Sequence, residues 1–116
     1  MNTDAIKDAR MALAQEIIVQ LGGNKFTIMT GAKQFMAIDN GLAFKLPGSP
    51  AGYTKQSINY VEVILNGKDL YDVSYYRFTN GRKQGLKKVV KHVDNDIYFD
   101  MLQDSFTEAT GLYTSL

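Results

Sequence analysis

The sequence predicts an α+β domain: an antiparallel sheet of about six short strands flanked by an N-terminal and a C-terminal helix. The two end segments have apolar residues at helical spacing. Between them, short runs alternate apolar and polar residues and meet at Asn-Gly pairs, which favour tight hairpin turns. A length of 116 residues fits one domain, residues 1–116.

The first amphipathic segment predicts a helix near the N-terminus. Its apolar residues recur with the spacing of one helical face: Ile6, Leu13, Ile17 and Leu21. Gly22 and Gly23 follow, and we expect them to end the helix, because glycine adopts the left-handed conformation without steric cost.

Six runs with strand character follow, at residues 25–29, 33–38, 42–46, 58–65, 69–78 and 84–93. Asn40-Gly41, Asn66-Gly67 and Asn80-Gly81 predict the hairpin turns. The last run also fits a helix, but a strand is favoured because the third turn leads into it and its valines are strand formers. Residues 47–57, which hold both prolines, predict the one long loop, and we expect it to be mobile.

The second amphipathic segment predicts a helix from about Asp96 to Thr110, ended by Gly111. At 100° per residue its apolar face comprises Tyr98, Leu102, Phe106 and Ala109. We expect the helix residues Ile17, Leu102 and Phe106 to cover one face of the sheet. The sheet residues expected beneath them are Phe26, Ile28, Phe44, Val61, Val63 and Leu65.

The composition argues against most catalytic and metal sites. The chain has no cysteine, which excludes disulfides, thiol nucleophiles and cysteine-ligated metals, and it has one histidine, His92. A lone histidine is more often a surface or packing residue than a catalyst. The nucleotide-binding motifs GxxxxGK[ST] and GxGxxG are both absent from the sequence. The run Thr30-Gly31-Ala32-Lys33 is better interpreted as a turn than as a phosphate site. We therefore expect no enzyme activity, no catalytic residue, no metal and no cofactor.

The N-terminal residues include acids and lack the apolar stretch of a secretory signal. No run approaches the length of a membrane span. These features predict a cytoplasmic protein without a membrane partner.

Charge is distributed unevenly along the chain. The net charge is +1, yet residues 1–72 sum to zero, residues 73–93 carry +6 with no acid, and residues 94–116 carry −5 with no base. Segregation of this kind indicates either charged partners or two faces of one fold that attract each other.

The basic segment mixes cations with aromatic residues, the combination that neutralises phosphates and stacks on bases. Its candidate residues for binding DNA or RNA are Tyr75, Tyr76, Arg77, Arg82, Lys83, Lys87, Lys88 and Lys91. The alternative is an ordinary edge hairpin whose lysines discourage pairing with other sheets.

The acidic segment places four carboxylates at four-residue steps on one face of the expected helix: Asp96, Asp100, Asp104 and Glu108. A solvated helix face, a surface for a basic protein partner and a cation site all remain open, with the solvated face favoured. If the acidic and basic segments lie on opposite sides, copies of the chain could also associate into a homo-oligomer.

Five blocks of the sequence are similar to those of known proteins: Gly22 to Phe26, Met29 to Lys33, Asn59 to Val61, Leu65 to Val73 and Thr110 to Leu116. In these blocks the chain resembles a family of short proteins encoded by bacteriophages and mobile elements. The resemblance covers residues 22–116 and implies a setting in the cytoplasm of a bacterial host. The family has no assigned site residues, so the resemblance implies none here.

Together these features predict a small non-enzymatic phage or mobile-element protein that associates with nucleic acid through the hairpin at residues 75–91. The alternative is an anti-defence or regulatory protein, of the anti-CRISPR or anti-restriction type. Such a protein would bind a host defence protein by presenting the acidic helix as a mimic of phosphates.

Overall fold

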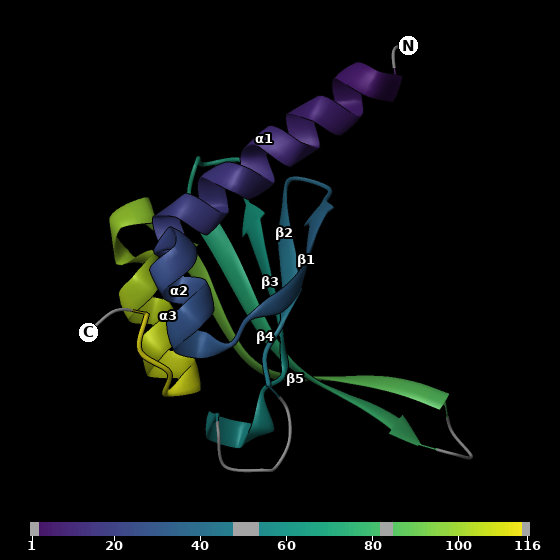
Figure 1. Ribbon diagram of the computed structural model, residues 1–116, viewed down its shortest axis with the longest axis vertical. Helices are drawn as coiled ribbons and strands as arrows, with labels where there is room; N and C mark the ends of the chain where they lie inside the picture. Colours follow the sequence, from purple (N-terminus) through teal and green to yellow (C-terminus); the bar gives the residue numbers. More distant parts are fainter. Residues whose placement is uncertain (1–2, 48–53, 82–84, 115–116) are drawn as a thin grey trace.

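Five antiparallel strands form one sheet in the computed structural model, which describes residues 3–47, 54–81 and 85–114. Each strand pairs with the next along the chain, so the sheet is a simple meander (Figure 1). The strands are β1 (Lys33–Ile38), β2 (Gly41–Lys45), β3 (Tyr60–Leu65), β4 (Tyr71–Gly81) and β5 (Gly85–Ile97). The helices are α1 (Thr3–Leu21), α2 (Gly23–Thr30) and α3 (Leu102–Thr110), with short 3₁₀ turns η1 (Lys55–Ser57) and η2 (Phe99–Met101).

The predicted α+β class is confirmed, with five strands in place of about six. The difference lies at residues 25–29, where the sequence predicts a strand and the chain forms helix α2. Phe26 and Thr30, one helical turn apart, are both buried, whereas Ile28 is 80% exposed rather than in the core. The Thr30 hydroxyl donates to the carbonyl of Phe26 at 2.7 Å, and Gly31 ends the helix in the left-handed conformation. Short apolar runs of this length fit either period, and burial of Phe26 favours the helix.

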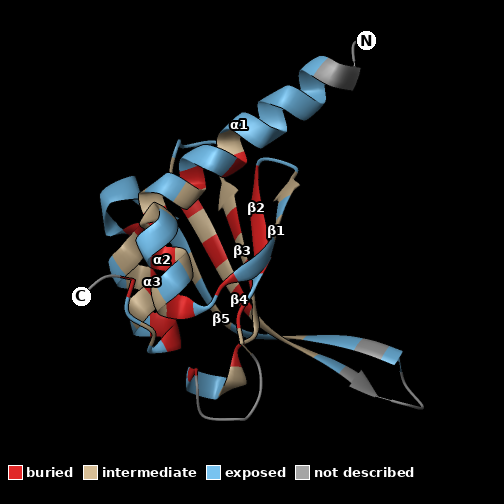
Figure 2. Cartoon of the chain, viewed as in Figure 1, coloured by how far each residue is buried: buried red, intermediate tan, exposed pale blue. Residues whose placement is uncertain are grey.

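Helix α1 confirms the predicted N-terminal helix, but only its C-terminal half reaches the core. Ile17 and Leu21 are buried, while Ile6 remains exposed because the first turns extend past the sheet (Figure 2). Arg10 in this projecting half forms an ion pair with Asp39 at the β1–β2 turn.

Glycine has a different role in the β1–β2 hairpin from the one predicted. The turn residues are Asp39 and Asn40, and Asn40 has the positive φ of 58°. Gly41 instead begins β2, where a Cβ atom would lie 2.0 Å from the carbonyl oxygen of Val63 on β3. The close approach of the two strands therefore requires glycine at this position.

Residues 84–93, which fit both helix and strand, lie in β5 as far as the structure describes them, in agreement with the favoured prediction. The strand continues to Ile97, so the last helix starts later than the predicted Asp96. The backbone N–H of Asp96 donates to a carboxylate oxygen of Asp72 at 3.0 Å, and Ile97 pairs with Tyr71. Tyr98 is consequently 62% exposed rather than on the buried face of the helix.

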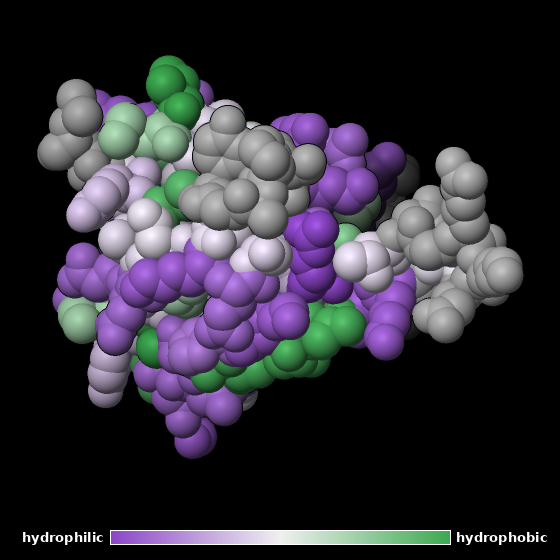
Figure 3. Space-filling model, turned by 90° about the horizontal axis from the view of Figure 1, so that it is seen from below, coloured by the Kyte–Doolittle hydropathy of each residue, from purple (hydrophilic) through white to green (hydrophobic). Residues whose placement is uncertain are grey.

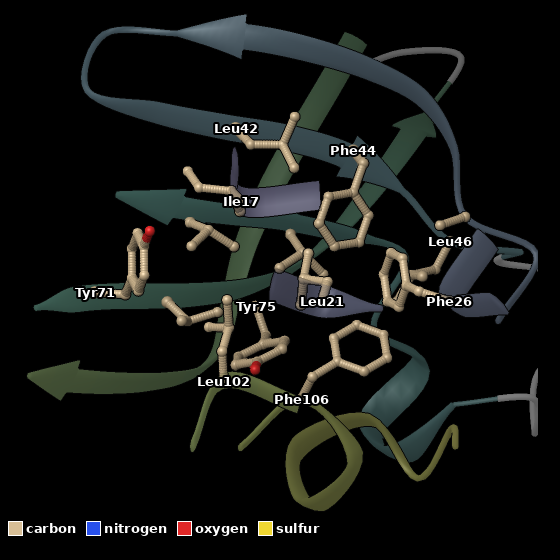
Figure 4. Packing of buried hydrophobic residues seen from close by; sticks show 14 of the residues in the cluster. Ile17, Leu21, Phe26, Leu42, Phe44, Leu46, Tyr71, Tyr75, Leu102 and Phe106 are labelled. Carbon is tan, nitrogen blue, oxygen red and sulfur yellow. The ribbon is translucent and has the colours of Figure 1, made fainter. Parts of the chain in front are cut away.

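A hydrophobic core fills the space between the helices and one face of the sheet (Figure 4). The Phe26 ring meets the Phe44 ring edge-on, with centroids 5.5 Å apart, and the Phe106 ring at 5.1 Å. Leu65 is only partly buried. Apart from Ile28 and Leu65, the predicted core residues are buried: Ile17, Phe26, Phe44, Val61, Val63, Leu102 and Phe106.

Tyr75 of β4 also belongs to this core, with no exposed surface. Its hydroxyl has no hydrogen-bond partner within 3.5 Å among the described residues, and burial raises the pKa of Tyr75 far above its ordinary value against a smaller opposing effect of the Ser105 hydroxyl beside it. The side chain therefore cannot stack on a base, and its place among the predicted nucleic-acid contacts is wrong.

Phe106→Ala should lower the free energy of unfolding by about 3–5 kcal/mol, because it removes a buried ring at the meeting point of α2, β2 and α3. Ile28→Ala is the matched control on an exposed side chain and should cost less than about 0.5 kcal/mol. Urea denaturation of both variants measures the difference, and equal losses would contradict the packing described.

Tyr75→Phe should leave the free energy of unfolding unchanged or raise it by up to about 1 kcal/mol, because it removes a buried hydroxyl without a hydrogen bond. The same denaturation experiment measures this change. A loss above about 1 kcal/mol would show that the hydroxyl makes a stabilising contact.

Candidate nucleic-acid interface

The sheet has two faces of different character, because successive side chains on a strand point to opposite sides. On β3, Val61 and Val63 point into the core under the helices, while Tyr60 and Glu62 point away from it. The strand register aligns residues from all five strands on this second side. We call it the open face, made of Lys33, Met36, Ala43, Lys45, Tyr60, Glu62, Ile64, Asp72, Ser74, Tyr76, Phe78, Lys88, Val90 and Val93.

Three partly exposed aromatic rings form a cluster on the open face. The Tyr60 ring lies 5.9 Å from the Tyr76 ring and 4.9 Å from the Phe78 ring, measured between centroids. The Lys88 ammonium lies 4.4 Å from the centroid of Tyr76, within the range of a cation–π contact.

Asn59 fixes the position of Phe78 beside Tyr60. Its side-chain oxygen accepts a hydrogen bond from the Phe78 backbone N–H at 2.7 Å, and its side-chain nitrogen donates to the Phe78 carbonyl at 2.9 Å. The amide thus extends the β3–β4 ladder by one residue. Two hydrogen bonds to its backbone therefore hold Phe78 in place within the aromatic cluster.

A groove of about 550 Å³ borders the aromatic cluster. It is lined by Lys33, Met36, Lys45, Leu46, Asn59, Tyr60, Phe78 and Thr79. Lys33 and Lys45 lie directly opposite each other on β1 and β2, and both are exposed. Like charges in this position repel, so the pair favours an anion between them. Figure 3 shows the molecule from below, where a hydrophobic strip lies beside hydrophilic side chains.

Two pKa directions describe the charges on this face. Burial and the charge of Glu62 raise the pKa of Tyr60, despite the opposing effect of Lys88, so the phenol is neutral at neutral pH. Partial desolvation acts against the charged form of Lys88, but the Glu62 carboxylate and the two tyrosines outweigh it and raise the pKa of Lys88. Lys88 is therefore a stable cation beside uncharged rings.

The structure divides the residues predicted to bind nucleic acid. Tyr76 and Lys88 belong to the open face, whereas Tyr75 lies in the core. Arg77 points to the other side of β4, where its guanidinium donates to the Ser57 carbonyl at 3.2 Å. Lys87 and Lys91 are exposed on β5, and Lys91 lies at a bulge in the pairing with β4. Arg82 and Lys83 lie outside the described residues.

The predicted row of acids on one helix is wrong, because α3 begins at Leu102. Asp96 lies in β5, where it forms an ion pair with Lys68 at 3.2 Å, and Asp100 lies in η2. Only Asp104 and Glu108 share α3, and both are exposed. Among the described residues, no three potential ligands are grouped to hold a metal ion. The outer described part of the β4–β5 hairpin extends away from α3 (Figure 1).

His92, the single histidine, takes part in a short polar chain between β5 and α3. Its Nε2 lies 2.8 Å from Asp94 Oδ1, and the Ser105 hydroxyl donates to Asp94 Oδ2 at 2.7 Å. The carboxylate stands between the imidazole and the hydroxyl, so the imidazole is not placed to take the serine proton. The chain of contacts instead connects α3 to the edge strand.

Sequence reasoning missed Tyr60, Lys45 and Glu62 as parts of one surface. It interprets Lys33 as part of a turn in preference to a phosphate site, and it includes Phe78 only as part of the basic segment. These residues lie far apart in the sequence and come together through strand register, which the alternation of each run does not specify.

The described residues include no helix that combines the length and the apolar character needed to cross a bilayer. No protein-family model, curated protein sequence or solved structure matches the chain. The open face must therefore be interpreted from its own geometry and charge.

Proposed function

We propose that the chain binds single-stranded nucleic acid on the open face. The observation that carries this proposal is the aromatic cluster of Tyr60, Tyr76 and Phe78, which stands between Lys88 on one side and Lys33 and Lys45 on the other. Aromatic rings stack on bases and lysines neutralise phosphates, and a strand of nucleic acid presents both at regular intervals.

The geometry favours an unpaired strand over a duplex. Rings lying on a sheet surface can stack only on bases that are not already stacked and paired within a double helix. Stacking is largely independent of sugar type, so both DNA and RNA remain candidate ligands.

The alternative, binding of a host defence protein by phosphate mimicry, has less support. It depended on four acids in one helical row, and only Asp104 and Glu108 share a helix among the residues that the structure describes. The resemblance to phage and mobile-element proteins favours action in the bacterial cytoplasm, where the replication of such elements exposes single strands.

Reversing the charge of the groove lysines should weaken binding strongly. Lys33→Glu with Lys45→Glu should raise the Kd for a labelled single strand by about tenfold or more, because the two cations no longer neutralise phosphates. The slope of log K against log salt should fall by about 0.7 for each phosphate that is no longer neutralised. Fluorescence anisotropy with single-stranded DNA and RNA of equal length measures both quantities.

The matched control carries the same charge change elsewhere, Lys7→Glu with Lys25→Glu, on exposed residues of α1 and α2. Equal weakening in the two double variants would mean that only net charge matters. An absence of binding by the unmodified protein at low salt would reject the proposed function.

Phe78→Ala should weaken binding to single strands by about 1–3 kcal/mol, the usual contribution of one base stacked on an aromatic ring. Tyr113→Ala removes an exposed ring near α3 and is the control. Urea denaturation should show that both variants remain folded. Unchanged affinity in folded Phe78→Ala would exclude this ring from the binding surface.

A further inference from the structure

Glu62 is an acid at the centre of a surface proposed to bind an anion. It lies on β3, the middle strand, opposite Ala43 of β2 and Ser74 of β4, which are both small. Its side chain is 21% exposed, and its Oε1 lies 3.3 Å from Lys88 Nζ. The side chains directly opposite Glu62 on the two neighbouring strands are thus both short, and the Tyr60 ring lies two residues away along β3 on the same side of the sheet.

Lys88 offsets part of the free-energy cost of burying the Glu62 carboxylate, but it does not use all of the carboxylate's capacity to accept hydrogen bonds. The contact involves one oxygen, while a carboxylate can accept about four hydrogen bonds. The ion pair holds the carboxylate in place and offsets its repulsion of phosphates. An acceptor with capacity to spare thus lies beside an aromatic ring on which a base could stack.

We propose that Glu62 determines base specificity, selecting bases that present an amino group over uracil and thymine. This inference rests on the proposed function. A base stacked on the aromatic cluster directs its edge across the sheet toward the neighbouring side chains. A carboxylate accepts hydrogen bonds from the N4 amino group of cytosine, as it does in base recognition generally.

Uracil has a carbonyl oxygen where cytosine has its amino group. Directed at Glu62, this oxygen would place two acceptors against each other, and the N3–H beside it is flanked by a second carbonyl. A site built around a polar group rejects an analogue that leaves this group unpaired. Cytosine and uracil are alike in size, so the pair isolates the contact with Glu62 from stacking.

The test compares oligodeoxycytidine with oligodeoxyuridine of equal length in anisotropy titrations at neutral pH. The unmodified protein should bind oligodeoxycytidine about tenfold more tightly, as expected for one hydrogen bond to a charged group. Glu62→Gln should bring the ratio close to one, because the amide can accept from cytosine and donate to uracil. Asp104→Asn, an equal charge change on α3, should leave the ratio unchanged.

The outcomes separate this inference from the proposed function. Binding of both oligonucleotides with equal affinity by the unmodified protein would overturn the role of Glu62 and keep single-strand binding; this result does not depend on any variant folding. A preference that persists in Glu62→Gln would overturn it as well. A failure to bind either oligonucleotide at low salt would overturn both proposals.

Discussion

The ring of Phe26, held between Phe44 and Phe106, joins three parts of the chain that are distant in sequence. Phe26 lies on α2, Phe44 on β2 and Phe106 on α3. Burial of the Phe26 ring between the other two stabilises α2 in this position. Most stability of short helices comes from such packing, since α2 has only 8 residues and would not persist alone. All three helices contribute side chains to the core on this one side of the sheet, as the packing in Figure 4 illustrates.

This one-sided arrangement explains why a small domain offers so much aromatic surface. A meander of five strands has two faces, and the core uses one. The open face carries Tyr60, Tyr76 and Phe78 where a solvated sheet would ordinarily carry polar residues. These rings gain only part of the free energy that full burial would give, and exposed aromatic clusters of this kind are typical of surfaces that bind a ligand.

Sequence patterns predicted the fold well where a segment had a single plausible partner. The Asn-Gly pairs identified the three hairpins to within a few residues, although Gly41 begins β2 and Asn80 and Gly81 still pair with β5, and the valines of residues 84–93 identified a strand. The errors occurred where a segment fits both a helix and a strand and tertiary contacts decide between them. Burial of Phe26 favours a helix at residues 23–30. Pairing of Ile97 with Tyr71 extends β5 beyond the predicted start of the last helix. Of the residues on the open face, only Tyr76 and Lys88 were among those predicted from the sequence to bind nucleic acid. Tyr75 was misassigned because adjacent aromatic residues on a strand face opposite sides, and the sequence alone does not say which side is covered.

The β4–β5 hairpin extends beyond the rest of the sheet because its two strands are longer than the others. Strands β4 and β5 have 11 and 13 residues, whereas β3 has 6 and its ladder to β4 ends with Asn59 beside Phe78. Beyond that point, Thr79 and Lys87 are paired only with each other among the described residues, and two strands alone are barely stable in water. The backbone amide hydrogens of Thr79 and Lys87 should exchange with solvent through local opening of the hairpin, whereas those of Val63 and Val73 should exchange only when the whole domain unfolds. A single pair of strands thus combines an inner half, in which β4 side chains reach the core, with an outer half that we expect to open by itself beside the aromatic cluster.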